Sequence, residues 1–196
     1  MDLSVNDVWA GEDLGGAGVY ACHQISYKRT ALAAEVRMAR PLRGRTGEST
    51  YFITVDAYQK QHLLQSERTA LLLIDVLLHY RKQQKYLLHE FVVMPHHIHV
   101  LLTPTGITIE RAVGLIKGGF SFRRAKELGL KGEIWQTSFH DWRVRDAEGY
   151  EGYRTYIHQN PVKANLVRTA AEFSYSSAVG SFPLDLMPQR LKPSEK

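Results

Sequence analysis

The alternation of apolar and polar positions divides the chain into strands and helices in a simple order. Residues 51–57 alternate aromatic and β-branched side chains, which is the pattern of a strand. Residues 66–84 place leucine and isoleucine at helical spacing and therefore predict an amphipathic helix. Residues 86–93 and 98–103 are apolar runs separated by a short break, and they predict two further strands.

A second helix, a fourth strand and a third helix complete this pattern. The spacing of apolar residues predicts a helix over 108–128, with Gly129 as its C-terminal stop. A fourth strand is expected within residues 135–145, and a third helix is expected over 146–160, because Pro161 disfavours helix in the residue before it. A short, separate helical turn is expected over 161–166. The order β-α-β-β-α-β predicts an α+β, ferredoxin-like antiparallel sheet with two packing helices and an additional C-terminal helix.

The centre of the chain is residues 91–102, FVVMPHHIHVLL, which contain two histidines two positions apart. Side chains alternate along a strand, so His97 and His99 share one face while Ile98 points to the other. Two adjacent neutral imidazoles are half of a divalent metal site. Most His-x-His pairs are solvated or hydrogen-bonded instead. This pair, however, lies in an otherwise apolar strand, where unpaired polar groups cost free energy.

The third predicted helix contains Tyr150, Tyr153 and Tyr156, followed by Asn160. Tyr156 and Asn160 are four residues apart and therefore lie on one helix face. The Asn160 carbonyl oxygen could be a third metal ligand, with a tyrosine one turn away. Two other interpretations stay open on the residues alone. Tyrosines at this spacing usually pack on a core, and asparagine before proline is common at helix N-termini.

Length and composition favour one globular domain with appendages. The chain has 196 residues, a hydrophobic content of 44%, a net charge of +5 and one cysteine. A single cysteine excludes an internal disulfide framework and a cysteine-rich zinc site. The apolar runs are shorter than the roughly 20 residues that a membrane helix needs, and no secretion signal is visible. We therefore expect a soluble, cytoplasmic, nucleoid-associated protein without membrane contact, and the positive charge is compatible with a polyanionic partner.

The expected domain organisation has three parts. Residues 1–37 are glycine-rich, lack sustained periodicity and carry more acidic than basic side chains, so they are expected to be a poorly ordered extension. The folded domain is expected to occupy residues 38–180. Residues 181–196 contain several prolines and lysines and are expected to form a flexible tail.

Two motifs together resemble a known family. The His97-Ile98-His99 strand and the segment YIHQNPVKA, which begins at Tyr156, resemble the single-tyrosine HUH transposases. They are most similar to the REP-associated tyrosine transposases (RAYTs), whose pattern is Met-Pro-x-His-hydrophobic-His and Tyr-Ile-x-x-Asn-Pro-Val. The resemblance extends from about Met38 to Ala178. One departure is Asn165, where the family usually has glycine, but asparagine tolerates the left-handed conformation.

This resemblance implies a mechanism on single-stranded or hairpin DNA. His97, His99 and Asn160 would bind one divalent metal, Mg²⁺ or Mn²⁺, at the scissile phosphate. Tyr156 would attack the phosphorus to give a 5′-phosphotyrosine link, and a DNA 3′-hydroxyl would later rejoin the strands. Such proteins are monomers or homodimers. The candidate phosphate-binding residues are Lys117, Arg123, Arg124, Arg143 and Lys163.

Three alternatives compete with this interpretation. A non-catalytic module could bind single-stranded nucleic acid through exposed aromatic side chains on the central strands. A different HUH nuclease, such as a replication initiator or a relaxase, would share the fold, and fold alone does not decide function. A domesticated, inactive transposase is the third, against which the intact His97, His99, Tyr156 and Asn160 argue.

Overall fold

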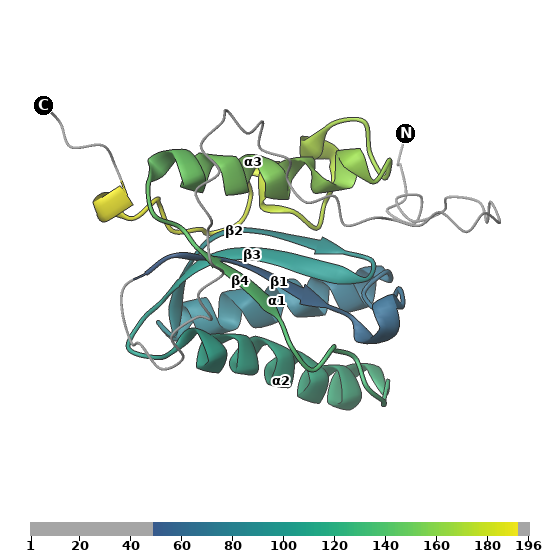
Figure 1. Cartoon of the computed structure of the whole chain (residues 1–196). Helices are drawn as coiled ribbons and strands as arrows, with labels where there is room; N and C mark the ends of the chain where they lie inside the picture. The colour runs from purple at the N-terminus through teal and green to yellow at the C-terminus, as the bar shows by residue number, and fades with distance from the viewer. Residues whose placement is uncertain (1–48, 192–196) are drawn as a thin grey trace, which may run out of the picture.

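A four-stranded sheet lies between two layers of helices in the computed structural model, which describes residues 49–191 (Figure 1). The strands are β1 (Tyr51–Asp56), β2 (Tyr86–Met94), β3 (His97–Pro104) and β4 (His140–Arg143). The helices are α1 (Glu67–Lys82), α2 (Ile109–Leu128) and α3 (Ala147–Lys163). Short 3₁₀ helices are η2 (Tyr58–Lys60), η3 (Ala170–Glu172), η4 (Ser177–Val179) and η5 (Gln189–Leu191). This element order confirms the order expected from the sequence.

The sheet has the strand order β2-β3-β1-β4, and every neighbouring pair is antiparallel. Helices α1 and α2 cover one face of the sheet, and α3 lies on the other face (Figure 1). The expected arrangement of two packing helices and an additional C-terminal helix is therefore confirmed. The main core lies between α1, α2 and the sheet, where Ile98 and Val100 are at most 1% exposed. Each such side chain contributes roughly 1.5–3 kcal/mol by burial.

Helix ends follow local sequence closely. Ser66, Thr108 and Asp146 are the N-caps of α1, α2 and α3, and each side chain accepts a hydrogen bond from the backbone N–H three residues later. Gly129 ends α2 in the left-handed conformation, with φ 69°. All four residues stand where the sequence pattern predicts a helix boundary.

The predicted end of α3 at Asn160 is wrong, because the helix continues through Pro161 to Lys163. Proline removes only its own N–H donor, and the turn after it is closed by a hydrogen bond from the Ala164 N–H to the Asn160 carbonyl. Pro161 is buried. Packing of this last turn on the molecule therefore overrides the local preference. Asn165 follows with φ 57°, in the conformation that glycine would adopt readily.

The C-terminal segment differs from the expected flexible tail over residues 181–191. The Asp185 N–H donates to the Leu88 carbonyl at 2.8 Å, and Arg81 donates two hydrogen bonds to the Asp185 carboxylate at 2.8 Å each. Leu191 is 4% exposed. These partners are far apart in sequence, so no local pattern could reveal them. The predicted N-terminal extension at residues 1–37 lies outside the described residues.

Candidate active site

The two histidines of β3 lie side by side on the sheet face that α3 covers. Their Nε2 atoms are 3.1 Å apart, and their ring centroids are 4.6 Å apart. Ile98 between them is fully buried on the other face. The alternation read from the sequence is thus confirmed, and the two imidazoles face a common space.

Burial keeps both imidazoles neutral. It lowers the pKa of His99 to about 3, and the positive charges of Lys60 and His96 act in the same direction. Burial also holds the pKa of His97 well below its ordinary value, with further lowering by His99 and His96. Neutral imidazole is the form that binds a metal ion. Near neutral pH, both rings therefore have lone pairs available for a ligand.

Thr54 on β1 is a site residue that the sequence did not reveal. It pairs with His99 in the sheet register, and its Oγ1 lies 2.8 Å from the His99 Nδ1. A hydrogen bond on Nδ1 orients the ring and leaves Nε2 for the space shared with His97. The alternation of residues 51–57 could have placed Thr54 on one strand face. Only the register of β1 against β3 puts it opposite His99.

Helix α3 brings Tyr156 and Asn160 to the histidine pair. The Tyr156 ring lies edge-to-face to His99, with centroids 5.1 Å apart. The Asn160 side chain hydrogen-bonds His97, which slightly opposes the lowering of the His97 pKa. The four residues predicted to form the site, from two segments distant in sequence, therefore lie together.

The other tyrosines of α3 occupy different environments. Tyr153 stacks on Phe52 of β1 with ring centroids 4.6 Å apart, and Phe52 in turn stacks on His99. Tyr150 is 4% exposed and lies edge-to-face to His89, and burial raises its pKa. The Tyr156 ring, by comparison, contacts His99 directly.

The donor atoms at this point fit a divalent metal ion. Nitrogen ligands about 2.1 Å from one ion and at right angles lie about 3 Å apart, close to the observed separation of the two Nε2 atoms. The Asn160 amide adds an oxygen donor beside them. Within residues 49–191, no group of three His, Cys, Asp or Glu side chains could hold a metal. An ion would thus depend on the amide as well as on the two imidazoles.

Three of the five predicted phosphate-binding residues lie on α2, across the sheet from the histidine pair. Lys117 donates to the Gln136 carbonyl at 2.6 Å. Arg123 forms ion pairs with an aspartate of α1 and a glutamate of α2. Arg124 is 7% exposed and donates to a backbone carbonyl. These side chains join elements of the fold, and the structure does not bring them to the site.

The remaining two basic residues differ from each other. Arg143 is exposed on β4, next to Trp142, which contacts Phe52 on the site face. Alternation along the strand therefore directs Arg143 to the opposite face. Lys163 has its Nζ 5.3 Å from the centre of the Tyr156 ring. Of the five predicted phosphate-binding residues, Lys163 is the one that lies beside the Tyr156 ring.

Comparison with known proteins identifies the family. Residues 48–160, more than half of the chain, match the model of the family described as "Transposase IS200 like". The chain belongs to this family. A REP-associated tyrosine transposase of Escherichia coli (strain K12) is 27% identical to it over 143 residues, which cover 69% of this chain and 83% of the relative.

A solved structure extends this similarity to three dimensions. A REP-associated tyrosine transposase bound to a REP hairpin aligns with a TM-score of 0.59 and 25% sequence identity. The alignment covers 80% of this chain and 96% of the other. The α+β fold expected from the order of strands and helices is therefore the fold of this IS200-like family member. Its described part contains no helix with the length and apolar character needed to cross a membrane.

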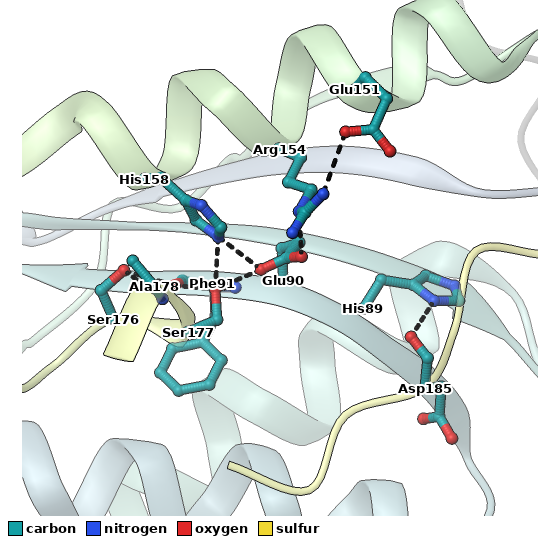
Figure 2. A network of polar contacts seen from close by, with 10 residues as sticks. All are labelled: His89, Glu90, Phe91, Glu151, Arg154, His158, Ser176, Ser177, Ala178 and Asp185. Carbon is teal, nitrogen blue, oxygen red and sulfur yellow. Dashed lines mark hydrogen bonds and ion pairs between the residues drawn. The ribbon is translucent and has the colours of Figure 1, made fainter. Parts of the chain in front are cut away.

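A buried polar network beside the site also escaped the sequence reading (Figure 2). Its centre is Glu90 of β2, which is 7% exposed. The Glu90 carboxylate lies 2.8 Å from the His158 Nε2, 3.0 Å from the Arg154 Nε and 2.5 Å from the Ser177 Oγ. His158 and Arg154 flank Tyr156 in the sequence. A glutamate inside an apolar strand could have indicated a buried polar network in the sequence. Its partners, however, belong to distant segments of the chain.

Proposed function

We propose that this IS200-like protein cleaves and rejoins single-stranded DNA at hairpins through a covalent link to Tyr156. The observation that carries the proposal is the direct contact between the Tyr156 ring and His99, within a pair of neutral imidazoles. The relative bound to a REP hairpin supports a hairpin DNA substrate. We therefore propose hairpin DNA of this kind as the substrate class.

The proposed reaction consists of two transesterifications. The Tyr156 hydroxyl oxygen attacks the scissile phosphorus while the bond from phosphorus to the 3′-oxygen breaks. The phenol loses its proton, and the departing 3′-oxygen gains one. The products are a 5′-phosphotyrosine and a free 3′-hydroxyl. A DNA 3′-hydroxyl then attacks the phosphotyrosine, restores a phosphodiester and releases the tyrosine, so no external energy source is needed.

A divalent ion is part of this proposal, held by His97, His99 and Asn160. When bound, it would polarise the scissile phosphate and help a phenol, whose ordinary pKa is about 10, to react near neutral pH. Mixed imidazole and amide ligation suits Mn²⁺ better than Mg²⁺. Lys163, beside the Tyr156 ring, is the basic residue best placed to meet a phosphate there.

The alternative of a simple binding module finds less support. That function needs exposed aromatic side chains on the central strands. The central strands are β3 and β1. On β1, Phe52 is buried and Tyr51 only partly exposed. The polar pair His97 and His99 occupies the corresponding place on β3, where a binding sheet would present stacking rings.

The decisive experiment mixes the protein with single-stranded hairpin DNA labelled at the 5′ or the 3′ end, with Mn²⁺ or Mg²⁺. We expect a metal-dependent adduct that carries the 3′ label, together with a released 5′-labelled fragment that ends in a 3′-hydroxyl. Tyr156→Phe should abolish the adduct because it removes only the nucleophilic oxygen. Tyr153→Phe is the matched control, and it should form the adduct because its ring can still stack on Phe52.

Other results would reject specific parts of the proposal. An adduct that persists in Tyr156→Phe would assign the nucleophile to Tyr153 or Tyr150. Binding of the hairpin without any adduct would favour a binding module or an inactive relative. An adduct that forms equally in the presence of a metal chelator would remove the ion from the mechanism.

A further inference from the structure

We infer that Glu90 is a positioning residue, which holds the tyrosine-bearing helix α3 in the orientation that the reaction needs. This inference rests on the proposed function of Tyr156. It adds a residue of β2 to the groups that set the position of Tyr156. The observations that carry it are a β-bulge, a buried carboxylate and three donors from two other segments.

The bulge in β2 directs Glu90 toward α3. Leu88 pairs with Leu102, but Glu90 pairs with Leu101, and the register shifts between Leu88 and Glu90. In a regular strand Leu88 and Glu90 would share a face, since they are two residues apart. The extra residue, His89, moves Glu90 to the face of Leu101 and the histidine pair. Bulges often redirect a side chain in this way beside active sites.

The buried carboxylate then needs partners, and α3 supplies two of them. Burial raises the pKa of Glu90, but hydrogen bonds from His158 and Ser177 and the charges of His158 and Arg154 outweigh this effect and lower it. The carboxylate is therefore ionised. A buried charge without such donors would be costly. Arg154 is about half exposed and contributes less than the more buried His158 and Ser177.

The donors are arranged so that they fix the helix about its own axis. Arg154 and His158 are four residues apart and lie on the α3 side that faces β2 (Figure 2). Tyr156 and Asn160 face the histidine pair on β3 instead. Ile157 between the two rows is fully buried. Rotation of α3 that moved Tyr156 away from His99 would also pull His158 from Glu90.

The third donor ties the C-terminal segment into the same point. Ser177 lies at the start of η4, and its Oγ also accepts a hydrogen bond from the Phe91 N–H at 3.1 Å. Next to it, the Val93 N–H donates to the Tyr175 carbonyl at 2.9 Å. Strand β2, helix α3 and the segment after it therefore meet at one carboxylate.

The test measures formation of the DNA adduct in a single turnover at saturating hairpin, and hairpin binding separately. Glu90→Gln and His158→Ala should each slow adduct formation by about 100-fold, because misplacement of a reacting group by about 1 Å has that effect. The dissociation constant of the DNA should stay within about threefold, since neither side chain is proposed to touch DNA. His158→Gln places an amide N–H donor near the position of the histidine Nε2, and it should recover part of the rate that His158→Ala loses.

A matched control separates positioning from general stability. Asp185→Asn weakens another partly buried ion pair, in which Asp185 of the C-terminal segment accepts hydrogen bonds from Arg81 of α1 and from the Leu88 N–H of β2. This pair holds the C-terminal segment and not α3. This variant should lower the melting temperature and leave the single-turnover rate within about threefold of the wild type. Equal rate losses in Asp185→Asn and Glu90→Gln, at equal loss of stability, would overturn the inference.

Two further readouts complete the test. The double variant Glu90→Gln/His158→Ala should react no more slowly than the slower single variant, because both changes break one interaction. Additive losses would contradict a shared role. Hydrogen exchange tests the same contact without DNA, and Glu90→Gln should accelerate exchange in residues 150–160 more than Asp185→Asn does. If the wild type forms no adduct, the proposed function fails, and exchange alone decides whether Glu90 holds α3.

Discussion

At the level of single residues, the histidine pair depends on a hydroxyl group from the neighbouring strand. Thr54 lies 2.8 Å from the His99 Nδ1, while the Nε2 atoms of His99 and His97 face each other at 3.1 Å. Partners on the far nitrogen of a ligand histidine fix the ring and its tautomer. The sequence motif identifies the two histidines, but the hydrogen-bond partner of His99, Thr54, lies on β1 and outside the motif.

We predict that Thr54→Val weakens binding of Mn²⁺ about 10- to 100-fold, the usual effect of removing such a partner. Valine keeps the shape of threonine and removes only the hydrogen bond. Titration calorimetry of the DNA-free protein measures the effect. Thr50→Val is the control, because the Thr50 hydroxyl likewise hydrogen-bonds a side chain of β3, that of Thr103, which lies away from the histidine pair. Unchanged Mn²⁺ affinity in Thr54→Val would show that the hydroxyl does not orient His99.

At the level of helices and strands, α2 and α3 show which features a local sequence pattern predicts and which it does not. The caps of both helices stand where the sequence predicts them, because a cap is a contact between residues three apart. The predicted end of α3 at Asn160 comes too early. The helix continues to Lys163 because Pro161 is buried, and its packing outweighs the local preference against helix. The basic side chains of α2 are absent from the site because the packing of α2, and not its charge, decides which sheet face it covers.

The two adjacent glycines of α2 give a sharp prediction about its packing. A Cβ atom at Gly119 would lie 2.8 Å from atoms of the Tyr80 ring on α1, whereas a Cβ at Gly118 would meet nothing within 4 Å. Gly119→Ala should therefore destabilise the protein by about 1–3 kcal/mol through overpacking. Gly118→Ala should stabilise it by roughly 0.5–1 kcal/mol through helix propensity.

Urea unfolding of the two glycine variants measures both effects in the same helix. Each variant adds one methyl group, so the difference between them reports the approach of α1 and α2. If both alanines stabilise the protein, Tyr80 moves aside without cost, and the close approach does not explain the glycine.

For the whole molecule, buried neutral histidines determine how stability changes in mild acid. Burial lowers the pKa values of His89, His96, His97 and His99 below the ordinary value of 6.5. The unfolded chain therefore binds protons at these residues at a pH where the folded protein does not. The contribution to stability is present above about pH 6.5 and is lost as the pH falls below it. The carboxylate of Glu90, with a lowered pKa, loses its contribution only at more acidic pH.

We predict that the free energy of unfolding falls between pH 7 and pH 5, by at most about 2 kcal/mol for each buried histidine. His89→Gln should make this dependence shallower, because it removes one of the four histidines with a lowered pKa. His140→Gln is the control, since His140 is exposed on β4. Urea unfolding at the two pH values measures the difference. Equal pH dependence in both variants and the wild type would show that His89 does not contribute.

The sequence by itself determined the element order, the helix caps, the face shared by His97 and His99, and the helix face shared by Tyr156 and Asn160. All of these follow from residues within a few positions of one another, where chain geometry alone sets the spacing. The resemblance to the REP-associated tyrosine transposases links the two motifs, although they are far apart in sequence.

Tertiary structure alone decided which residues meet across those elements. The register of β1 against β3 places Thr54 at His99, and the bulge in β2 turns Glu90 toward α3. Contacts between distant segments hold Asp185 against Arg81, although a loose tail was expected there. The physical reason is the same in each case. Sheet register and helix packing are set by the burial of many side chains at once, and a local stretch of sequence does not contain that information.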